Sequence, residues 1–184
     1  PGWELYHKWQ DFGFASWLPY HGAGYVTGGS SIGGTGTDNI DPYHFRSNMA
    51  PSMTLCFDMR RKDLDYRLAR RLFGQLRQIA PYYLCDYYPL TDHSLKNDVW
   101  LAWQYDRPEK GDGIVQAFRR QDCATGSARL RLRGLDPAAS YRVTDLDENN
   151  SRTVVGKELM EQGLSVAIRA RPGAAVIRYA KSKP

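Results

Sequence analysis

The stretch MTLCFDMRRKDLDYRLARRLFGQLRQIA, from Met53 to Ala80, decides the expected fold of the first half of the chain. Its beginning, Met53–Met59, is largely apolar and predicts a buried strand. Apolar residues then recur at every fourth position, which predicts a helix over Leu64–Ala80 with Asp63 as N-cap and Pro81 as its stop. A single amphipathic helix after a buried strand indicates that the helix packs onto a sheet.

Upstream of this stretch, the spacing of apolar residues predicts a short helix over Glu4–Phe12 and a buried strand over Phe14–Leu18, which stops at Pro19. The next segment, His21–Pro42, is rich in glycine and predicts a long loop. The glycines do not form a phosphate cradle, because no Gly-Lys-Ser/Thr follows them. A flexible rim loop is the simplest interpretation.

The second half of the chain, from Asp86, alternates apolar and polar residues over short runs separated by turn residues. Alternation of this kind places one face of a strand in a core and the other in water. The six predicted strands are Val99–Tyr105, Ile114–Arg119, Ala128–Arg133, Tyr141–Leu146, Leu164–Ile168 and Ala175–Tyr179. We therefore predict an antiparallel β-sandwich over residues 86–184, and a separate α/β domain over residues 1–85.

Composition excludes several classes of protein. The chain has 184 residues, of which 42% are apolar, so it can bury one ordinary core or two small ones. No stretch is long and apolar enough to cross a membrane, and no signal segment opens the chain. Three widely spaced cysteines predict neither a disulfide framework nor a zinc site, so we expect a reducing, cytoplasmic setting. We predict no cofactor and no metal.

A formal net charge of +5 raises the alternative of nucleic-acid binding. Arginines crowd the predicted helix, and Arg129, Arg131 and Arg133 share one face of a predicted strand. However, 20 acidic residues are interspersed, and no RNA- or DNA-binding signature is present. Charged runs are usually the solvated side of an amphipathic element, so we predict neither a nucleic-acid partner nor a membrane partner.

Several blocks in order along the chain resemble a known family. They are SWLPYHGAG (Ser16–Gly24), DPYHFRSNMAPSMTLCFDMRR (Asp41–Arg61), IAPYYLCDYYPLT (Ile79–Thr91), WLAWQYDRP (Trp100–Pro108), VQAFRR (Val115–Arg120), LRGLDPAASYRVTDLD (Leu132–Asp147) and GKELMEQGLSV (Gly156–Val166). Together they resemble the C-terminal portion of glycoside hydrolase family 36, the alpha-galactosidase type. The Gly-rich segment Tyr25–Asn39 departs from the family pattern.

The resemblance implies the last two strands and the last helix of a (β/α)₈ barrel, followed by the β-sandwich. Phe14–Leu18 would be the seventh strand and Met53–Met59 the eighth. Members of the family are retaining enzymes, which need two carboxyl groups about 5 Å apart. The resemblance places both aspartates upstream of this segment, and Asp11, at the junction of a predicted helix and strand, is not a match. We therefore predict no catalytic residue here and a chain that is inactive alone.

Four residues are candidates for contacts with a sugar. His21 closely follows the predicted seventh strand, where barrel enzymes place site residues, and Trp17 and Tyr20 could form a stacking wall. Arg46 could bind a carboxylate in bidentate fashion. The alternatives are structural: a capping histidine, core aromatics, and an arginine that braces the last strand. Asp58 could orient a site residue or pair with Arg60 or Arg61.

Two main functions follow from these features. In the first, the chain is the C-terminal part of an alpha-galactosidase-like hydrolase that acts on carbohydrate, an alpha-galactoside, and it supplies a cleft wall and a β domain. In the second, it is a non-catalytic carbohydrate-binding or structural β-sandwich module. Two parallel strands cannot close a barrel, so we also expect self-association through their unpaired edges.

Overall fold

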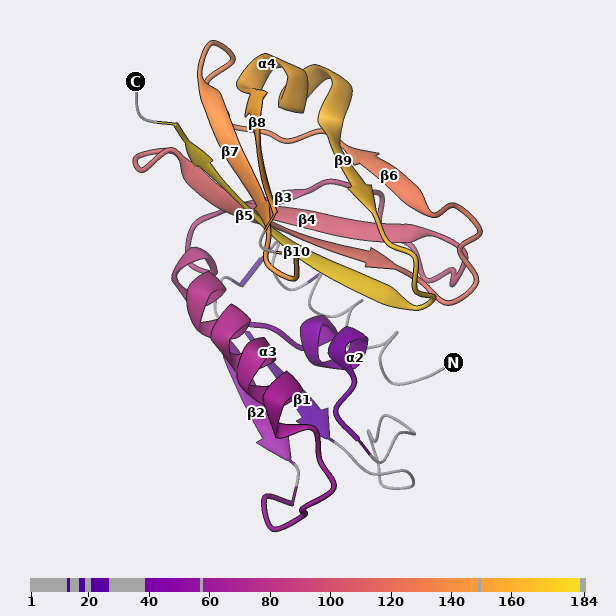
Figure 1. Cartoon of the computed structure of the whole chain (residues 1–184). Helices are drawn as coiled ribbons and strands as arrows, with labels where there is room; N and C mark the ends of the chain where they lie inside the picture. Colours follow the sequence, from indigo (N-terminus) through magenta and orange to yellow (C-terminus); the bar gives the residue numbers. More distant parts are fainter. Residues whose placement is uncertain are drawn as a thin grey trace. The chain divides into compact units, whose positions relative to one another are not determined.

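The computed structural model describes residues 13, 17–18, 21–26, 39–56, 58–148 and 150–182, without the side chains of Tyr25 and Val26. The chain divides into two compact units, Pro1–Leu84 and Cys85–Pro184 (Figure 1). Cys56, Cys85 and Cys123 are all free thiols. Within the described ranges, no helix is long and apolar enough to cross a membrane.

The first unit contains a pair of parallel strands and two helices. Strand β1 (Gly22–Val26) pairs with β2 (Ser52–Cys56), and Gly22 lies opposite Ser52. Helix α2 (Pro42–Ser47) begins at Asp41, whose side chain accepts a hydrogen bond from the His44 amide at 2.6 Å. Helix α3 (Tyr66–Ile79) continues into a short 3₁₀ turn, Ala80–Tyr82.

Helices α2 and α3 are joined by one aromatic contact and one polar contact. Phe45 meets Phe73 edge to face, with ring centroids 5.4 Å apart. Arg46 donates from Nε and Nη2 to Oε1 of Gln75, at 3.2 and 3.0 Å. Phe45, Arg46 and Gln75 are all almost fully buried. The two contacts together therefore hold α2 against the buried face of α3.

The structure corrects the predicted loop His21–Pro42, because a strand lies at Gly22–Val26 within it. Of the predicted strand Phe14–Leu18, Trp17 is in a turn and Leu18 is in no regular element, and residues 14–16 lie outside the described residues. The predicted helix over Glu4–Phe12 lies outside the described residues. The predicted eighth strand is shorter than expected, because β2 ends at Cys56.

Helix α3 confirms the predicted helix but begins later than expected. Asp65, not Asp63, is the N-cap, and its side chain accepts from the Leu68 amide at 2.9 Å. Asp63 is instead held by Arg61 in a bidentate ion pair. An aspartate whose two oxygens are engaged by a guanidinium is not available to cap a helix.

The second unit is built from antiparallel strands, as the alternation in the sequence predicts (Figure 1). A six-stranded sheet has the order β3-β4-β5-β10-β7-β8, and a separate two-stranded sheet pairs β6 with β9. The strands are β3 (Asp86–Pro89), β4 (Trp100–Arg107), β5 (Asp112–Arg119), β6 (Ser127–Leu130), β7 (Ser140–Asp145), β8 (Ser151–Val155), β9 (Leu164–Ala167) and β10 (Gly173–Lys181). A helical turn, α4 (Gly156–Glu158) with its extension Leu159–Gly163, joins β8 to β9.

The core of this unit lies between the six-stranded sheet and the β6–β9 pair. In the centre of the six-stranded sheet, Ala117 is opposite Ala102 on β4 and opposite Ala175 on β10. The β6–β9 side of the same core contributes larger residues, among them Leu130, Leu132, Leu164 and Val166. Small residues on one layer and large residues on the other allow the two layers to interdigitate at normal packing density.

One glycine of the sheet is required by a close approach. Gly113 on β5 lies opposite Tyr179 on β10, and a Cβ at position 113 would collide with the Tyr179 hydroxyl. The tyrosine ring therefore crosses the glycine backbone, which only a residue without a side chain permits. This contact places the Tyr179 hydroxyl inside the core, beside Asp106.

Arg119, at the end of β5, is a buried cation whose partners are all backbone carbonyls. Its guanidinium donates to the carbonyl oxygens of Cys123, Ala124, Ile168 and Arg169, at 2.8–3.1 Å. The side chain is only 6% exposed. It thereby ties the turn after β5 to the turn before β10.

We predict that Arg119→Gln lowers the free energy of unfolding by about 3 kcal/mol, because buried carbonyls lose a charged donor. Urea denaturation followed by tryptophan fluorescence measures this change. Arg142→Gln is the matched control, because Arg142 lies exposed on β7 of the same sheet, and its loss should stay within about 0.5 kcal/mol. Equal losses of unfolding free energy in the two variants would contradict this role of the Arg119 contacts.

The β1–β2 pair leads to a second prediction. Among the described residues, each of these strands has the other as its sole partner, so two outer strand edges carry unpaired peptide groups. We expect the 184-residue chain to self-associate through these edges. Sedimentation velocity at increasing concentration should show the sedimentation coefficient rising, and a monomer throughout would contradict the prediction.

Candidate functional site

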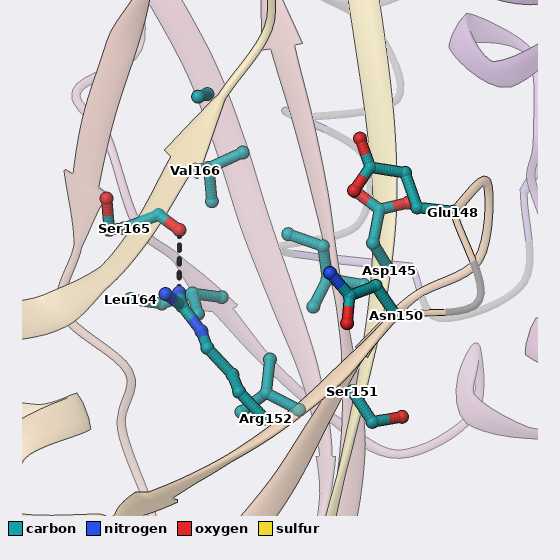
Figure 2. Close-up of a pocket in the computed structure, with 11 residues that line it drawn as sticks. Asp145, Glu148, Asn150, Ser151, Arg152, Leu164, Ser165 and Val166 are labelled. Atoms are coloured by element: carbon teal, nitrogen blue, oxygen red, sulfur yellow. Dashed lines mark hydrogen bonds between the residues drawn. The ribbon is translucent and has the colours of Figure 1, made fainter.

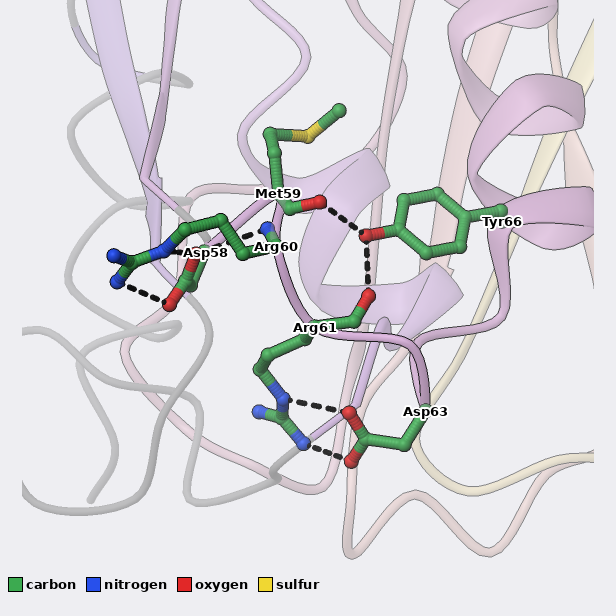
Figure 3. Close-up of polar contacts among 6 residues, drawn as sticks. All are labelled: Asp58, Met59, Arg60, Arg61, Asp63 and Tyr66. Carbon is green, nitrogen blue, oxygen red and sulfur yellow. Dashed lines mark hydrogen bonds and ion pairs between the residues drawn. The ribbon is translucent and has the colours of Figure 1, made fainter.

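The segment after β2 lies at the carboxyl end of the β1–β2 pair. Parallel strands present the loops at their carboxyl ends as binding surfaces in α/β folds. Asp58 lies two residues after the end of β2, and both of its carboxylate oxygens are bound by Arg60, from Nε at 2.9 Å and from Nη2 at 2.8 Å (Figure 3). The hydrogen bonds from the Arg60 side chain and backbone lower the pKa of Asp58. Asp58 is therefore an ionised carboxylate rather than a proton donor.

The rest of this loop is held in one conformation by further contacts (Figure 3). The Tyr66 hydroxyl can donate its one proton to either of two carbonyl oxygens, that of Arg61 at 2.7 Å or that of Met59 at 3.0 Å. Arg61 binds Asp63 through both nitrogens of the same edge of its guanidinium. Met59, 67% exposed, is the apolar tip of the loop. We call residues 58–66 the β2–α3 loop.

His21 and Trp17 lie before β1 instead of after it. The His21 carbonyl accepts from the Ser52 amide at 3.2 Å, which places His21 at the amino end of the strand pair. Its ring donates from Nδ1 to the Leu18 carbonyl at 3.2 Å, and partial burial lowers the pKa of the imidazole. Trp17 is 85% exposed, so it is not a core residue.

The other two predicted residues differ in accessibility. Arg46 is 3% exposed and donates to the Gln75 side chain on helix α3, which is a contact to a helix and not to the last strand. Tyr20 lies outside the described residues. The structure thus gives Trp17 the exposure that stacking on a sugar requires, and gives Arg46 a structural contact. The roles of all four residues in sugar binding stay predictions.

The second unit contains a groove of about 240 Å³ beside β8 and β9 (Figure 2). Asp145 and Glu148 lie at one side of the groove, and Arg152 lies at the other, where its Nη2 donates to the Ser165 carbonyl at 2.9 Å. Asp145 Oδ1 accepts from the Asp147 amide at 2.8 Å, which is the hydrogen bond of a turn. Within the described part of the chain, no group of three potential metal ligands occurs.

A buried polar cluster lies in the core of the second unit. The Tyr179 hydroxyl donates to Asp106 Oδ1 at 2.5 Å and accepts from Gln104 Nε2 at 2.7 Å. Gln104 also bonds both backbone polar groups of Arg133. Burial raises the pKa of Asp106 to about 6, against a smaller opposing effect of the Tyr179 hydrogen bond. Sequence inspection missed this cluster because its members are 73 and 75 residues apart.

Comparison with known proteins identifies the second unit. Residues 100–178 match the family model described as "Glycosyl hydrolase family 36 C-terminal domain". This part of the chain is a glycosyl hydrolase family 36 C-terminal domain. The resemblance inferred from the sequence blocks is therefore confirmed. No curated protein matches the sequence.

Solved structures extend the similarity to nearly the whole chain. The galactosidase domain of the alpha-galactosidase-sucrose kinase AgaSK has a TM-score of 0.75 and 17% identity, over 97% of this chain and 25% of that chain. The family 36 alpha-galactosidase AgaB from Geobacillus stearothermophilus has a TM-score of 0.65 and 19% identity, over 88% and 22%. An AgaA variant from Geobacillus stearothermophilus, solved in complex with stachyose, has a TM-score of 0.66 and 17% identity, over 87% and 21%.

These identities are low, so the likeness concerns the fold. The chain spans about a quarter of the length of AgaSK and less of the other two structures. The antiparallel architecture of the family 36 domain agrees with the predicted β-sandwich.

Asp106 makes the stability of the family 36 domain depend on pH. The pKa of Asp106 is about 6 in the folded state, against 3.8 for an unperturbed aspartate, which stands for the unfolded state. The folded state therefore holds the proton more tightly than the unfolded state. Stability is therefore highest below about pH 4 for this group, falls as the pH rises to about 6, and is level above that. The difference between these two pKa values corresponds to about 3 kcal/mol in the free energy of unfolding.

We predict that Asp106→Asn removes most of this pH dependence, as measured by urea denaturation between pH 4 and pH 7. Asp136→Asn is the control, because the Lys181 hydrogen bond lowers the pKa of Asp136 and places its titration below the same window. A wild-type curve that is flat between pH 4 and pH 6 would contradict the assignment.

Proposed function

We propose that this chain is the C-terminal part of an alpha-galactosidase-like retaining glycoside hydrolase, in which it supplies one wall of the substrate cleft and the β domain. The observation that carries the proposal is the structural likeness to the galactosidase domain of AgaSK over 97% of the chain, together with the family 36 domain at residues 100–178. The complex of the AgaA variant with stachyose supports a carbohydrate, an alpha-galactoside, as the substrate of the parent protein.

Under this proposal, β1 and β2 are the last two strands of a (β/α)₈ barrel and α3 is its last helix. The parallel register of β1 and β2 supports this interpretation, because parallel neighbours are the pairing of such barrels. The β2–α3 loop then lies at the carboxyl end of the barrel, where substrate binds. Trp17, Tyr20, His21 and Arg46 stay predicted sugar contacts, but His21 lies at the opposite, amino end of the strand pair and Arg46 is buried, so neither is assigned to this rim.

Hydrolysis with retention needs one ionised carboxylate and one protonated carboxyl about 5 Å apart. Asp58 supplies an ionised carboxylate, but Arg60 already occupies both of its oxygens. The sequence after Val26 contains no carboxyl group before Asp38. As the family resemblance implies, we assign the catalytic pair of the parent protein to residues upstream of this segment.

The alternative function, a non-catalytic carbohydrate-binding module, receives no support from the β domain. Binding modules of this kind present aromatic rings to the sugar face. Within the described residues 85–182, every aromatic side chain is buried or half-buried. The β domain is therefore assigned a packing role.

We predict that the isolated chain does not hydrolyse raffinose or p-nitrophenyl-α-galactoside, whereas the full product of the coding DNA read upstream of Pro1 does. Proton NMR of the first-formed sugar anomer should show retention of configuration. Hydrolysis by the isolated chain, or a full product without activity on either galactoside, would overturn the proposal. Heat-treated protein in each assay controls for contaminating hydrolase.

A further inference from the structure

Three arginines form a row on one face of the β domain. Arg129 lies in β6, and Arg131 and Arg133 follow it, alternating with the buried Leu130 and Leu132. Burial alternates from Arg129 to Arg133, with the three arginines exposed and the two leucines buried, so the arginines lie on the solvent side of the segment. Their Cα atoms are spaced by roughly 7 Å from one to the next. All three side chains are exposed. We call them the arginine row.

The arginine row differs from the paired guanidinium groups of the domain. Arg107 binds Asp112 through two nitrogens, and Arg119 binds four carbonyls. Among the described residues, no side-chain hydrogen bond or ion pair involves Arg129, Arg131 or Arg133. Three like charges at this spacing repel one another, and a bound anion would relieve that repulsion.

The arginine row borders a hollow of about 360 Å³. Its remaining lining is aliphatic, from Leu90, Leu132 and Met160. A hollow of this volume suits one small ligand. The lining contains no aromatic side chain on which a nucleic-acid base could stack, so the hollow lacks the main feature of a single-strand nucleic-acid site.

We propose that the arginine row and its hollow bind a sugar that carries a phosphate or sulfate ester. The planar guanidinium fork matches the oxygens of such an oxyanion and donates two hydrogen bonds to it. Leu90 and Met160 offer an apolar surface to the C–H face of the sugar ring. The sugar component of this inference rests on the proposed function, whereas the oxyanion component rests on the arginines alone.

The test measures binding of galactose 6-phosphate to the 184-residue chain by isothermal titration calorimetry. Galactose, inorganic phosphate and glucose 6-phosphate are titrated in parallel. The double variant Arg129→Gln/Arg131→Gln should weaken binding of galactose 6-phosphate at least about tenfold, because two charge-assisted contacts are lost. The matched control, Arg142→Gln/Arg169→Gln, removes the same charge from two exposed arginines outside the hollow and should change binding less than about twofold.

The outcomes separate the components of the inference. Binding of galactose as tight as that of galactose 6-phosphate, or equal losses in the two double variants, would overturn the oxyanion site. Inorganic phosphate bound as tightly as the sugar phosphates would overturn the sugar component. Glucose 6-phosphate bound as tightly as galactose 6-phosphate would support the site, and it would leave the alpha-galactoside assignment of the parent protein to the hydrolysis assay.

Phosphate esters also occur in nucleic acids, so an oligothymidylate of eight nucleotides is titrated as a further probe. Binding of this probe that is tighter than that of galactose 6-phosphate, and that is lost in Arg129→Gln/Arg131→Gln, would overturn the sugar assignment. We expect the sugar phosphate to bind more tightly, and its affinity to fall as sodium chloride is raised, because salt screens exposed charges.

Discussion

The β domain depends on the close approach of the β6–β9 pair to the centre of the six-stranded sheet. Ala102, Ala117 and Ala175 lie side by side on three neighbouring strands, and they leave room for the leucines and valine on the β6–β9 side of the core. Larger residues at these alanines would push the β6–β9 pair outward, and overpacking of this kind costs about 1–3 kcal/mol. The central strand β5 is buried along its whole length, so the sheet has little room to adjust.

Polar groups that enter this core are held by dedicated partners. Arg119 is satisfied by carbonyls of two turns, and Gln104 is satisfied by the Tyr179 hydroxyl and the backbone of Arg133. Burial of Asp106 costs free energy, because its carboxyl group loses hydration and gains in return a hydrogen bond from Tyr179. The same cluster connects the core to the arginine row, because Gln104 fixes the backbone at Arg133, the last residue of that row.

Periodicity in the sequence predicted the elements with strong apolar patterns. Helix α3 follows from its leucines, and six strands of the β domain follow from alternation, whereas β3 and β8 were missed. Strand β8, Ser-Arg-Thr-Val-Val, lies at the edge of the sheet and is mostly exposed, so it carries no apolar alternation. Strand β1 was missed because Gly-Ala-Gly-Tyr-Val resembles a loop, and it is recognisable as a strand only through its pairing with β2. The Arg46–Gln75 contact spans 29 residues and has no local signal.

The chemistry of the carboxyl groups explains why a chain with this fold needs further residues for catalysis. A retaining hydrolase uses two carboxyls whose environments push their pKa values apart, in one site open to substrate. The chain contains one carboxyl group of each kind, because the pKa of Asp58 is lowered and that of Asp106 is raised. However, Asp106 is 2% exposed and shares the inner face of the sheet with Ala102, where no substrate reaches it. Its raised pKa is a consequence of core burial, and a perturbed carboxyl is evidence of a catalytic acid only where a substrate can contact it.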